Sequence, residues 1–563
     1  MTALRLGPML RHVGTDDATI WVETDGPCSV EVRAGAVTGE ARTFQVASHH
    51  YAIVALQGFA PGSSTEYEVH LDGAYVWPDP ASNRPPSRIR TIDPVRPLEI
   101  AFGSCREPAT PGRHRGIAPD VLEAYSDRLA DGSETTWPDA LLLLGDQVYA
   151  DDTSKAMQRF IAGRRDPKVP PKYEVADFEE YTRLYDEAWS EPSIRWLFST
   201  VPISTIFDDH DIRDDWNTSR SWREEMQATP WWDLRITSGL MAYWLYQHLG
   251  NLSPAGLAES EILAAVRAAE DGEEVLREFA RHADHEADGA KGTLWSYRRD
   301  FGRVRLVVID SRCGRILNER RRMMISDPEF AWVERQLTDG DCDHLVIGTS
   351  MPWLLPRALH EIESWDEVLA APAHGRFISA IGEWLRRGAD LEHWAAFRLS
   401  FDRLTDLLGR VGRGADGTAP PATICVLSGD VHHTYVAEAN YPEPMTSRVY
   451  QVTGSPFHNT IPRGMRLVFH VGWSKVVEIA MKAISRLSGV PPLPIYWHHP
   501  TGPHFGNALS VLSLDGRSAR LLLRRSVAGD RAPADEHRGR RDGPTQLETL
   551  AELDLTAPGH PTT

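Results

Sequence analysis

The chain has 563 residues, of which 42% are apolar and 25% charged, values typical of a globular protein rather than a disordered one. Its net charge of −19 disfavours any role that depends on general attraction to nucleic acid or to an anionic membrane. No apolar run approaches the roughly 20 residues of a membrane span. The chain shows no secretory signal and its five cysteines form no CxxC pair, so we expect a cytoplasmic location, with export open should this be a mature form.

The first 92 residues are expected to form a small β domain. The segments ATIWVET, CSVEVRAG, HHYAIVALQGF and TEYEVHLDG alternate apolar and polar residues and are separated by Gly, Pro and Asp turns. This spacing predicts an immunoglobulin-like or fibronectin-like β-sandwich over residues 1–92. A linker near DPVRPLEI then leads to a larger domain over residues 97–526.

In the larger domain, four apolar segments end in clusters of polar residues. They are LEIAFGSCRE, DALLLLGDQVYADD, STIFDDHDIRDDW and TICVLSGDVHHTY. Ligands of open α/β sheets gather at the carboxyl ends of the strands, so these clusters are expected to meet at one site. The pattern favours an α/β fold.

Other segments of the larger domain predict its core and its hairpins. The segment HWAAFRLSFDRLTDLL repeats large apolar residues at helical spacing, which indicates a buried helix face. GTLWSYRRDFGRVRLVVIDSR predicts two paired strands, and GNALSVLSLDGRSARLLLRRS predicts a hairpin around Asp515-Gly516. Residues 527–563 are polar and rich in Arg, Asp, Gly and Pro, so we expect a disordered tail there.

Each polar cluster taken singly also fits a structural role. Asp208 and Asp209 would suit a helix cap, Cys105 an inert buried thiol, and His432-His433 a hydrogen-bonded core pair. Together they supply the inventory of a two-metal hydrolytic centre. Thiol, phenol and imidazole suit a transition metal such as iron, whereas carboxylate oxygens suit calcium, magnesium or manganese, so two unlike metal sites are expected.

The successive blocks GSCRE, LLLLGDQVYADD, FDDHDIRDDW, LVVIDSR, GTSMPWLL, LSGDVHHTYV and GSPFHN resemble the alkaline phosphatase D (PhoD-like) family of the calcineurin-like metallophosphoesterase superfamily. The resemblance runs in order from about residue 98 to 525. It implies an α/β fold with a two-sheet metallophosphoesterase sandwich flanked by helices (αββα). It also implies a metal-dependent phosphoric ester hydrolase of the alkaline phosphatase type, in which hydroxide held between two metals attacks phosphorus in line.

The resemblance assigns metal ligands residue by residue. Asp146 would bridge the two metals, and Tyr149 of the GDQVY block would bind the iron-like site, as in the GDxxY pattern of purple acid phosphatases. The expected ligands of Fe³⁺ are completed by Cys105 and His432. Asp209 and Asp430 would hold Ca²⁺, with Mn²⁺, Mg²⁺ or Zn²⁺ as alternatives at that second site.

Three further residues are expected to act on the substrate. His210 would protonate the leaving oxygen, a task suited to a side chain that titrates near neutral pH. Arg106 and Arg312 are candidates for binding phosphate oxygens, although Arg312 could equally pair with Asp310. The pair Asp214-Asp215 departs from relatives that carry asparagines there, and its added negative charge would either recruit another cation or disfavour a dianionic monoester.

Two alternatives to a phosphatase remain at this stage. A phosphodiesterase or phospholipase D-like activity would use the same two-metal centre, because the loops that select the leaving group are not predictable. In a different class, a catalytically silent protein would hold metal and bind a partner through its β domain. The expected partner is a small phosphorylated substrate, with no role as a nucleic-acid scaffold and with the oligomeric state left open.

Overall fold

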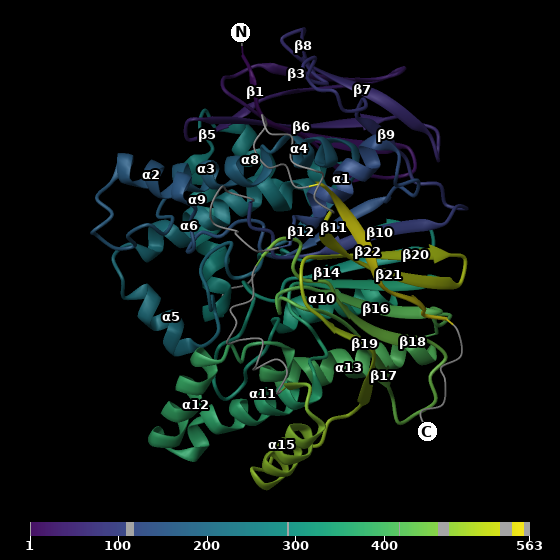
Figure 1. The fold of residues 1–563 in the computed structure, drawn as a ribbon. Helices are drawn as coiled ribbons and strands as arrows, with labels where there is room; N and C mark the ends of the chain where they lie inside the picture. Colours follow the sequence, from purple (N-terminus) through teal and green to yellow (C-terminus); the bar gives the residue numbers. More distant parts are fainter. Residues whose placement is uncertain are drawn as a thin grey trace.

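The structure is a computed structural model that describes residues 2–108, 118–289, 292–415, 417–459, 472–529 and 543–556. Its strands form four sheets, two in the N-terminal region and two in the region that follows (Figure 1). The expected mixed α/β fold with a preceding β domain is confirmed. Within the described ranges, no helix combines the length and the apolarity that crossing a bilayer requires.

The N-terminal region is a sandwich of two antiparallel sheets. One sheet has the order β1-β2-β6-β5, with strands Leu4–Val13 (β1), Asp17–Thr24 (β2), Phe44–Val46 (β5) and His49–Gln57 (β6). The other has the order β4-β3-β7-β8, with β9 paired to β7, and its strands are Ser29–Ala34 (β3), Val37–Arg42 (β4), Ser64–Leu71 (β7), Ala74–Trp77 (β8) and Arg88–Arg90 (β9). Alternate residues such as Val30 and Val32 are buried in a core of their own, as the period of two requires.

The larger region is built on two sheets that share a core. The six-stranded sheet has the order β12-β11-β10-β20-β21-β22, with strands Leu98–Gly103 (β10), Ala140–Leu144 (β11), Ile203–Ile206 (β12), Ala508–Asp515 (β20), Ser518–Gly529 (β21) and Gly543–Asp554 (β22). The seven-stranded sheet has the order β13-β14-β15-β16-β18-β17-β19, with strands Tyr297–Phe301 (β13), Val304–Ile309 (β14), His344–Thr349 (β15), Thr423–Ser428 (β16), Thr434–Asn440 (β17), Arg448–Thr453 (β18) and Tyr496–His504 (β19). Phe102 and Leu142 of the first sheet join Val308 and Leu427 of the second in one buried cluster.

Helices cover both sheets. Apolar residues of α1 (Val121–Asp131), α3 (Phe178–Trp189), α4 (Pro192–Thr200) and α6 (Trp232–Ala242) belong to the same buried cluster as the six-stranded sheet. The seven-stranded sheet packs on α10 (Asp327–Thr338) and α13 (Arg398–Arg413), and α11 (Arg357–Ala370) lies beside them. The remaining helices are α2 (Lys155–Arg164), α5 (Arg220–Gln227), α7 (Pro254–Glu259), α8 (Glu261–Ala268), α9 (Glu273–Asp284), α12 (Arg376–Gly388) and α15 (Lys475–Leu487).

The core and hairpins follow the sequence patterns, but part of the C-terminal prediction is wrong. The expected helix stripe of Trp394, Phe397, Phe401, Leu404 and Leu408 is buried, and the pairs β13–β14 and β20–β21 form as predicted. Residues 543–554, expected to be disordered, form β22 and pair with β21. The prediction overlooked the leucines of TQLETLAELDL because the polar residues on both sides of them dominate the composition of the tail. Those flanking residues, 530–542 and 557–563, lie outside the described residues.

The N-terminal sandwich and the larger region share a buried polar contact. Fully buried Arg11 of β1 donates to the carbonyl oxygens of Tyr246 and Gln247, at 2.7 and 2.6 Å. His49 of β6 lies between Glu23 at 2.8 Å and Glu179 of α3 at 2.9 Å. The two regions are therefore held in one arrangement by hydrogen bonds from the buried side chains of Arg11 and His49.

Candidate metal centre

Four strand ends bring their polar side chains together, as the sequence predicted. Cys105 follows β10, Asp146 follows β11, Asp208 and Asp209 follow β12, and Asp430 and His432 follow β16. Their ligand atoms form three groups, and within each group all atoms lie within 4.8 Å of one another. The first group is Cys105, Asp146 and His432, the second is Asp146, Asp209 and His210, and the third is Asp208, Asp209 and Asp430. Because Asp146 and Asp209 each belong to two groups, the three form one continuous centre.

The backbone at these strand ends is strained. Cys105, Asp146, Asp430 and His432 have φ angles of 55°, 44°, 67° and 50°, in a region that non-glycine residues rarely adopt. Gly145 has a φ of 112°, and a Cβ there would lie 2.8 Å from the Cβ of Asp208. Such conformations cost free energy and persist where the surrounding structure holds them, which is frequent at functional sites.

The first part of the centre combines a thiol, a phenol, a carboxylate and an imidazole. The Tyr149 hydroxyl donates to Asp146 Oδ2 at 3.4 Å and accepts from Asn459 Nδ2 at 2.7 Å. The Cys105 sulfur lies 3.0 Å from Ser104 Oγ and 3.4 Å from Ser455 Oγ. Burial raises the pKa of Cys105 and of Tyr149 well above their usual values, so both need a cation to act as anionic ligands.

The second part consists of carboxylates around Arg312. The guanidinium of Arg312 is fully buried; its Nε donates to Asp208, and its Nη2 lies 3.3 Å from Asp209 and 3.5 Å from Asp430. Its Nη1 donates to Glu392 at 2.5 Å. Asp310 accepts a hydrogen bond from the backbone N–H of Arg312. The guanidinium of Arg312 pairs with the carboxylates of the centre instead.

Buried carboxylate oxygens in both parts lack a hydrogen-bond donor. Asp146 Oδ1 and Asp208 Oδ2 are buried, and no described residue donates to either of them. Burial also raises the pKa of Asp146 and Asp208 well above the usual range for aspartate. A buried charge without a partner is costly, so these oxygens fit cation ligands. The donor set therefore fits two metals, a softer N/S/O site and a carboxylate site.

His210 is oriented by Asp151. Its Nδ1 lies 2.9 Å from Asp151 Oδ1, its ring packs 4.8 Å from the Tyr149 ring, and its Nε2 lies 3.7 Å from Asp214 Oδ1. Burial alone would lower the pKa of His210, but the carboxylates of Asp151 and Asp209 more than offset it and raise that pKa well above 6.5. The imidazolium in turn overcomes burial at Asp151 and lowers the pKa of that carboxyl to about 2.

Arg106 points away from the centre. Its Nε donates to Asp120 at 2.7 Å, at the N-cap of α1, and its Nη1 donates to the Ala188 carbonyl at 2.7 Å. Its Nη2 lies 3.5 Å from Glu123. These contacts tie β10 to α1 and α3, so the geometry gives no support to the predicted phosphate contact.

Several residues at the centre were missed by sequence reasoning. His393, beyond α12, bonds Asp430 Oδ2 through Nε2 at 2.8 Å and Glu363 of α11 through Nδ1 at 2.6 Å. Although burial acts against it, the bond from His393 lowers the pKa of Asp430 below the usual range. Asp151, Glu392 and Asn459 are likewise partners of predicted residues. Asp151 lies in the segment DALLLLGDQVYADD and Asn459 ends the block GSPFHN, which follows β18, whereas His393 and Glu392 carried no signal at a strand end.

Comparisons with known proteins identify the family and the fold of the chain. A family model described as PhoD-like phosphatase matches residues 121–469, and a domain of unknown function, DUF7800, matches residues 1–89. No curated protein matches the sequence. A solved structure of PhoD has a TM-score of 0.58 at 12% identity, covering 98% of this chain and 91% of that chain, which shows a common fold. The purple acid phosphatase PPD1 from yellow lupin (Lupinus luteus) seeds gives a TM-score of 0.47 at 12% identity, with 92% and 71% covered.

Proposed function

We propose that the strand-end centre hydrolyses small phosphoric esters with two unlike metal ions, since this chain belongs to the PhoD-like phosphatase family and is a metal-dependent phosphoesterase. The observation that carries the proposal is the overlap of the three ligand groups at Asp146 and Asp209. A carboxylate shared between neighbouring ligand groups is what a two-metal site with a bridging ligand requires.

The residues divide between the two metals by donor type. Cys105, Tyr149 and His432, together with Asp146, would hold Fe³⁺, because thiolate, phenolate and imidazole suit a transition metal. Asp209 and Asp430, again with Asp146, would hold Ca²⁺, with Mn²⁺, Mg²⁺ and Zn²⁺ as alternatives. Asp208 offers a free oxygen to the same carboxylate site.

The residues around the metals orient the reacting groups. Bound metals would supply positive charge to the phosphoryl oxygens and lower the pKa of the attacking water. Asp151 holds the Nδ1 of His210, which leaves the proton on Nε2 free to pass to the leaving oxygen as the P–O bond breaks. Arg312 places its guanidinium among Asp208, Asp209 and Asp430, where it keeps three repelling carboxylates in position.

A phosphodiester is the second candidate substrate. Asp214 Oδ1 lies 3.7 Å from the Nε2 of His210, so one more carboxyl group borders the place of the leaving oxygen. A diester carries one negative charge whereas a monoester carries up to two. When ionised, the added carboxyl group therefore favours the diester relative to the monoester.

The test compares an aryl phosphomonoester with the matching diester. Purified full-length protein is assayed with iron and calcium supplied, then after a chelator, and its metal content is measured by elemental analysis. We expect hydrolysis that the chelator abolishes and that the two metals together restore. Undiminished turnover after metal removal would contradict the metal-centre proposal, and metal-loaded protein that hydrolyses neither ester would contradict the proposed activity.

A further inference from the structure

Two helices at one end of the molecule, α12 and α15, turn large apolar side chains outward. Phe377 and Trp384 of α12 are 79% and 72% exposed, and Val476, Ile479 and Leu487 of α15 are 76%, 70% and 90% exposed. We name these five residues the α12/α15 face. Among the described residues, one other large apolar side chain, Val95, is exposed to this extent. The exposure is therefore concentrated on one pair of helices.

The fully buried residues of α12 and α15, which pack toward α11, are small or polar. Gly382 of α12 has no room for a Cβ, and Arg386 reaches Asp366 of α11 at 3.5 Å. Ser485 of α15 donates to the Glu361 carbonyl of α11 at 3.3 Å. A surface helix normally buries its apolar stripe and exposes its polar one. Both helices are reversed in this respect, so packing within the chain does not account for the apolar residues of the α12/α15 face.

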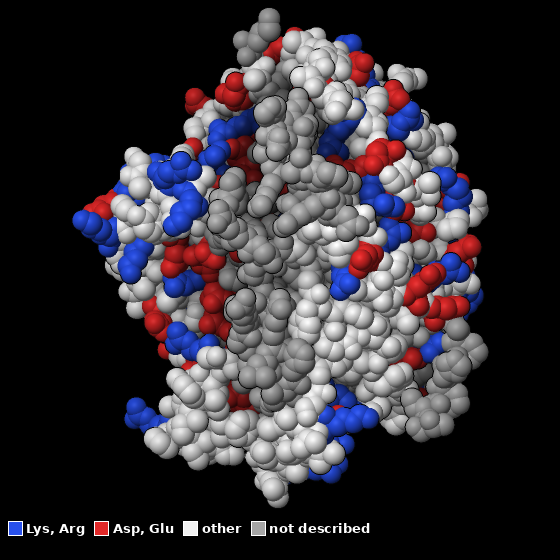
Figure 2. Space-filling view, viewed as in Figure 1, with Lys and Arg blue, Asp and Glu red and all other residues white. Residues whose placement is uncertain are grey.

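The charges around the α12/α15 face are basic. The exposed charged residues on the two helices are Arg376, Lys475 and Arg486. The acidic residues of the helices are already paired, since Glu383 contacts Arg386 and Glu478 contacts Arg357. Figure 2 shows the lower end of the molecule, where Figure 1 places α12 and α15, as mostly uncharged surface with Lys and Arg at its edges.

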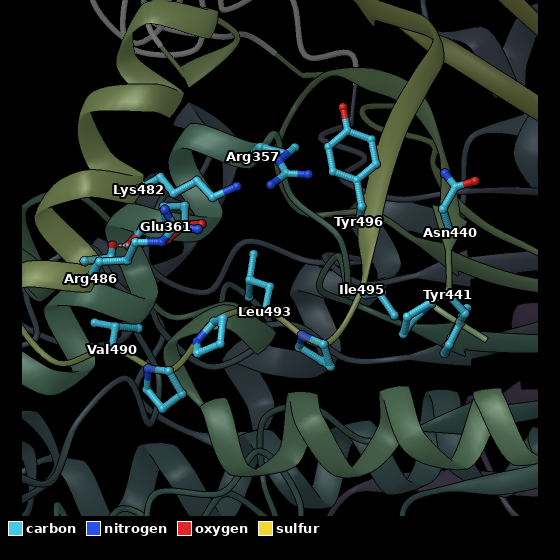
Figure 3. A pocket seen from close by; sticks show the side chains of 15 residues that line it. Arg357, Glu361, Asn440, Tyr441, Lys482, Arg486, Val490, Leu493, Ile495 and Tyr496 are labelled. Atoms are coloured by element: carbon cyan, nitrogen blue, oxygen red, sulfur yellow. Dashed lines mark hydrogen bonds between the residues drawn. The ribbon is translucent and has the colours of Figure 1, made fainter. Parts of the chain in front are cut away.

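A cavity of about 400 Å³ lies beside α15 (Figure 3). Lys482 and Arg486 line it together with Glu361 and with Arg357, which is paired with Glu478, and the segment from Val490 to Tyr496 forms another wall. The side chains of Lys482 and Arg357 lie on the same side of the cavity, opposite Ile495 and Tyr441 (Figure 3). An anionic group attached to an apolar chain matches this combination of cations and apolar surface.

We propose that the end formed by α12 and α15 docks onto an anionic lipid surface. Phe, Trp and aliphatic side chains on one helix face, bordered by Lys and Arg, are the pattern of helices that lie in the headgroup region of a bilayer. The cations around α15 would meet lipid phosphates. The net charge of −19 acts weakly against this contact, because salt screens exposed charges beyond about 8–10 Å.

A second copy of the chain fits the α12/α15 face less well than a lipid surface does. In a twofold dimer formed through this face, both subunits would contribute the same patch. The positive charges of Arg376, Lys475 and Arg486 on one subunit would then lie near the same positive charges on the other. An anionic bilayer instead offers opposite charge to all three residues. The inference does not depend on the proposed catalysis, because lipid binding is measured without turnover.

The test is co-sedimentation of the full-length protein with vesicles. Vesicles of phosphatidylcholine alone are compared with vesicles that also contain phosphatidylglycerol, at low and high salt. We expect binding to the anionic vesicles that weakens at high salt. The double variants Phe377→Ser/Trp384→Ser and Val476→Ser/Ile479→Ser are each expected to lower the apparent affinity about tenfold or more, since inserted apolar area drives such binding.

Two controls separate docking from misfolding and from dimerisation. Val95→Ser removes an equally exposed apolar side chain outside the α12/α15 face and is expected to leave vesicle binding unchanged. All variants should keep the thermal midpoint and the ester hydrolysis of the parent protein. The proposal is overturned if the parent protein fails to bind anionic vesicles or if the helix variants bind as well as the parent. It is also overturned if the parent is a dimer in solution that the same substitutions convert to a monomer.

Discussion

Buried polar side chains gather in two regions of this protein, and the regions differ in how those side chains are satisfied. At the contact between the N-terminal sandwich and the larger region, Arg11 donates to two carbonyls through its two terminal nitrogens, although no described residue accepts from its Nε, and His49 lies between two carboxylates. At the strand-end centre, oxygens of Asp146 and Asp208 accept from no described residue. Buried groups that are paired within the chain hold a fold together, whereas buried carboxylate oxygens without a donor are groups that a bound cation would satisfy.

The backbone differs in degree between the two regions. The proposed ligand residues Cys105, Asp146, Asp430 and His432 all have positive φ angles although none is a glycine, whereas Gly7 and the single residue Ala47 have positive φ angles on the sandwich side of the contact. Glycine takes that conformation at little cost, and the other residue types do not. We infer that the residues of the contact stabilise the fold, whereas the residues of the centre adopt unfavourable backbone conformations that place their side chains around a metal. Substitutions in the two regions should therefore fail in different assays.

The largest effect is expected at Asp146, which two ligand groups share. Asp146→Asn should lose both metals and lower the rate of ester hydrolysis about 10³-fold or more, because metal ions supply several kcal/mol of transition-state stabilisation. Metal content and hydrolysis rate check this. The matched control Asp515→Asn, at an exposed hairpin turn, should leave both unchanged. An Asp146→Asn protein that keeps two metals would refute the bridging role.

His210 should affect rate without affecting metal. His210→Ala is expected to lower the rate about 10²-fold or more, the usual contribution of a general acid, while metal content stays that of the parent protein. Asp151→Asn should show a smaller loss in the same direction, because it keeps an oxygen that can accept from Nδ1 but removes the negative charge that favours the imidazolium. Loss of metal from His210→Ala would instead assign this residue as a ligand with Asp146 and Asp209.

Substitution of His393 should weaken the binding of one metal and leave the other bound. It orients Asp430, so His393→Gln is expected to weaken calcium binding about 10–100-fold while iron content is retained, as for other groups that hold a metal ligand in place. Calcium titration of the iron-containing protein measures this, with the exposed His374→Gln as the control. Equal loss of both metals would show that the two sites are not independent.

The sequence located the side chains that meet at the centre better than it located their partners. Cys105, Asp146, Asp209 and Asp430 each follow an apolar strand directly, and an apolar run that ends in a polar cluster is a local signal. His393 lies 37 residues before the carboxylate that it bonds. Contacts across such separations depend on how helices pack on the sheet, which no short motif encodes.

The two arginines show the same limit. Arg106 and Arg312 both follow strand ends, so their sequence context alone did not distinguish them. The guanidinium of Arg312 reaches Asp208, Asp209 and Asp430, whereas Asp120 at the start of α1 draws the guanidinium of Arg106 away. The position of a charged side chain near a site can therefore be predicted from a motif, but its partner is decided by the surrounding fold.

At the contact between the two regions, Arg11 should matter for stability and not for catalysis. Arg11→Met would remove the charged donor of the Tyr246 and Gln247 carbonyls, and a hydrogen bond to a charged group is worth about 1.5–3 kcal/mol. We expect the free energy of unfolding to fall by about 3 kcal/mol, measured by urea denaturation of the metal-loaded protein. Arg5→Met, which removes a partly exposed partner of Glu23, should cost less than about 1 kcal/mol. A lower rate of ester hydrolysis per folded Arg11→Met molecule would contradict the assignment of Arg11 to stability alone.

The smallest effect is expected at His49 and should depend on pH. Burial alone would lower the pKa of His49, but its bonds to Glu23 and Glu179 more than offset it and raise that pKa above 6.5. Because the folded pKa is raised, the stabilisation is fully present below pH 6.5 and is lost as the pH rises through the folded value. His49→Gln should therefore lower the free energy of unfolding by about 1–2 kcal/mol at pH 6 and by less at pH 9, since bonds to a charged group are worth about that much. An equal loss at both pH values would show that His49 acts through packing against Tyr51 and Phe178 rather than through its charge.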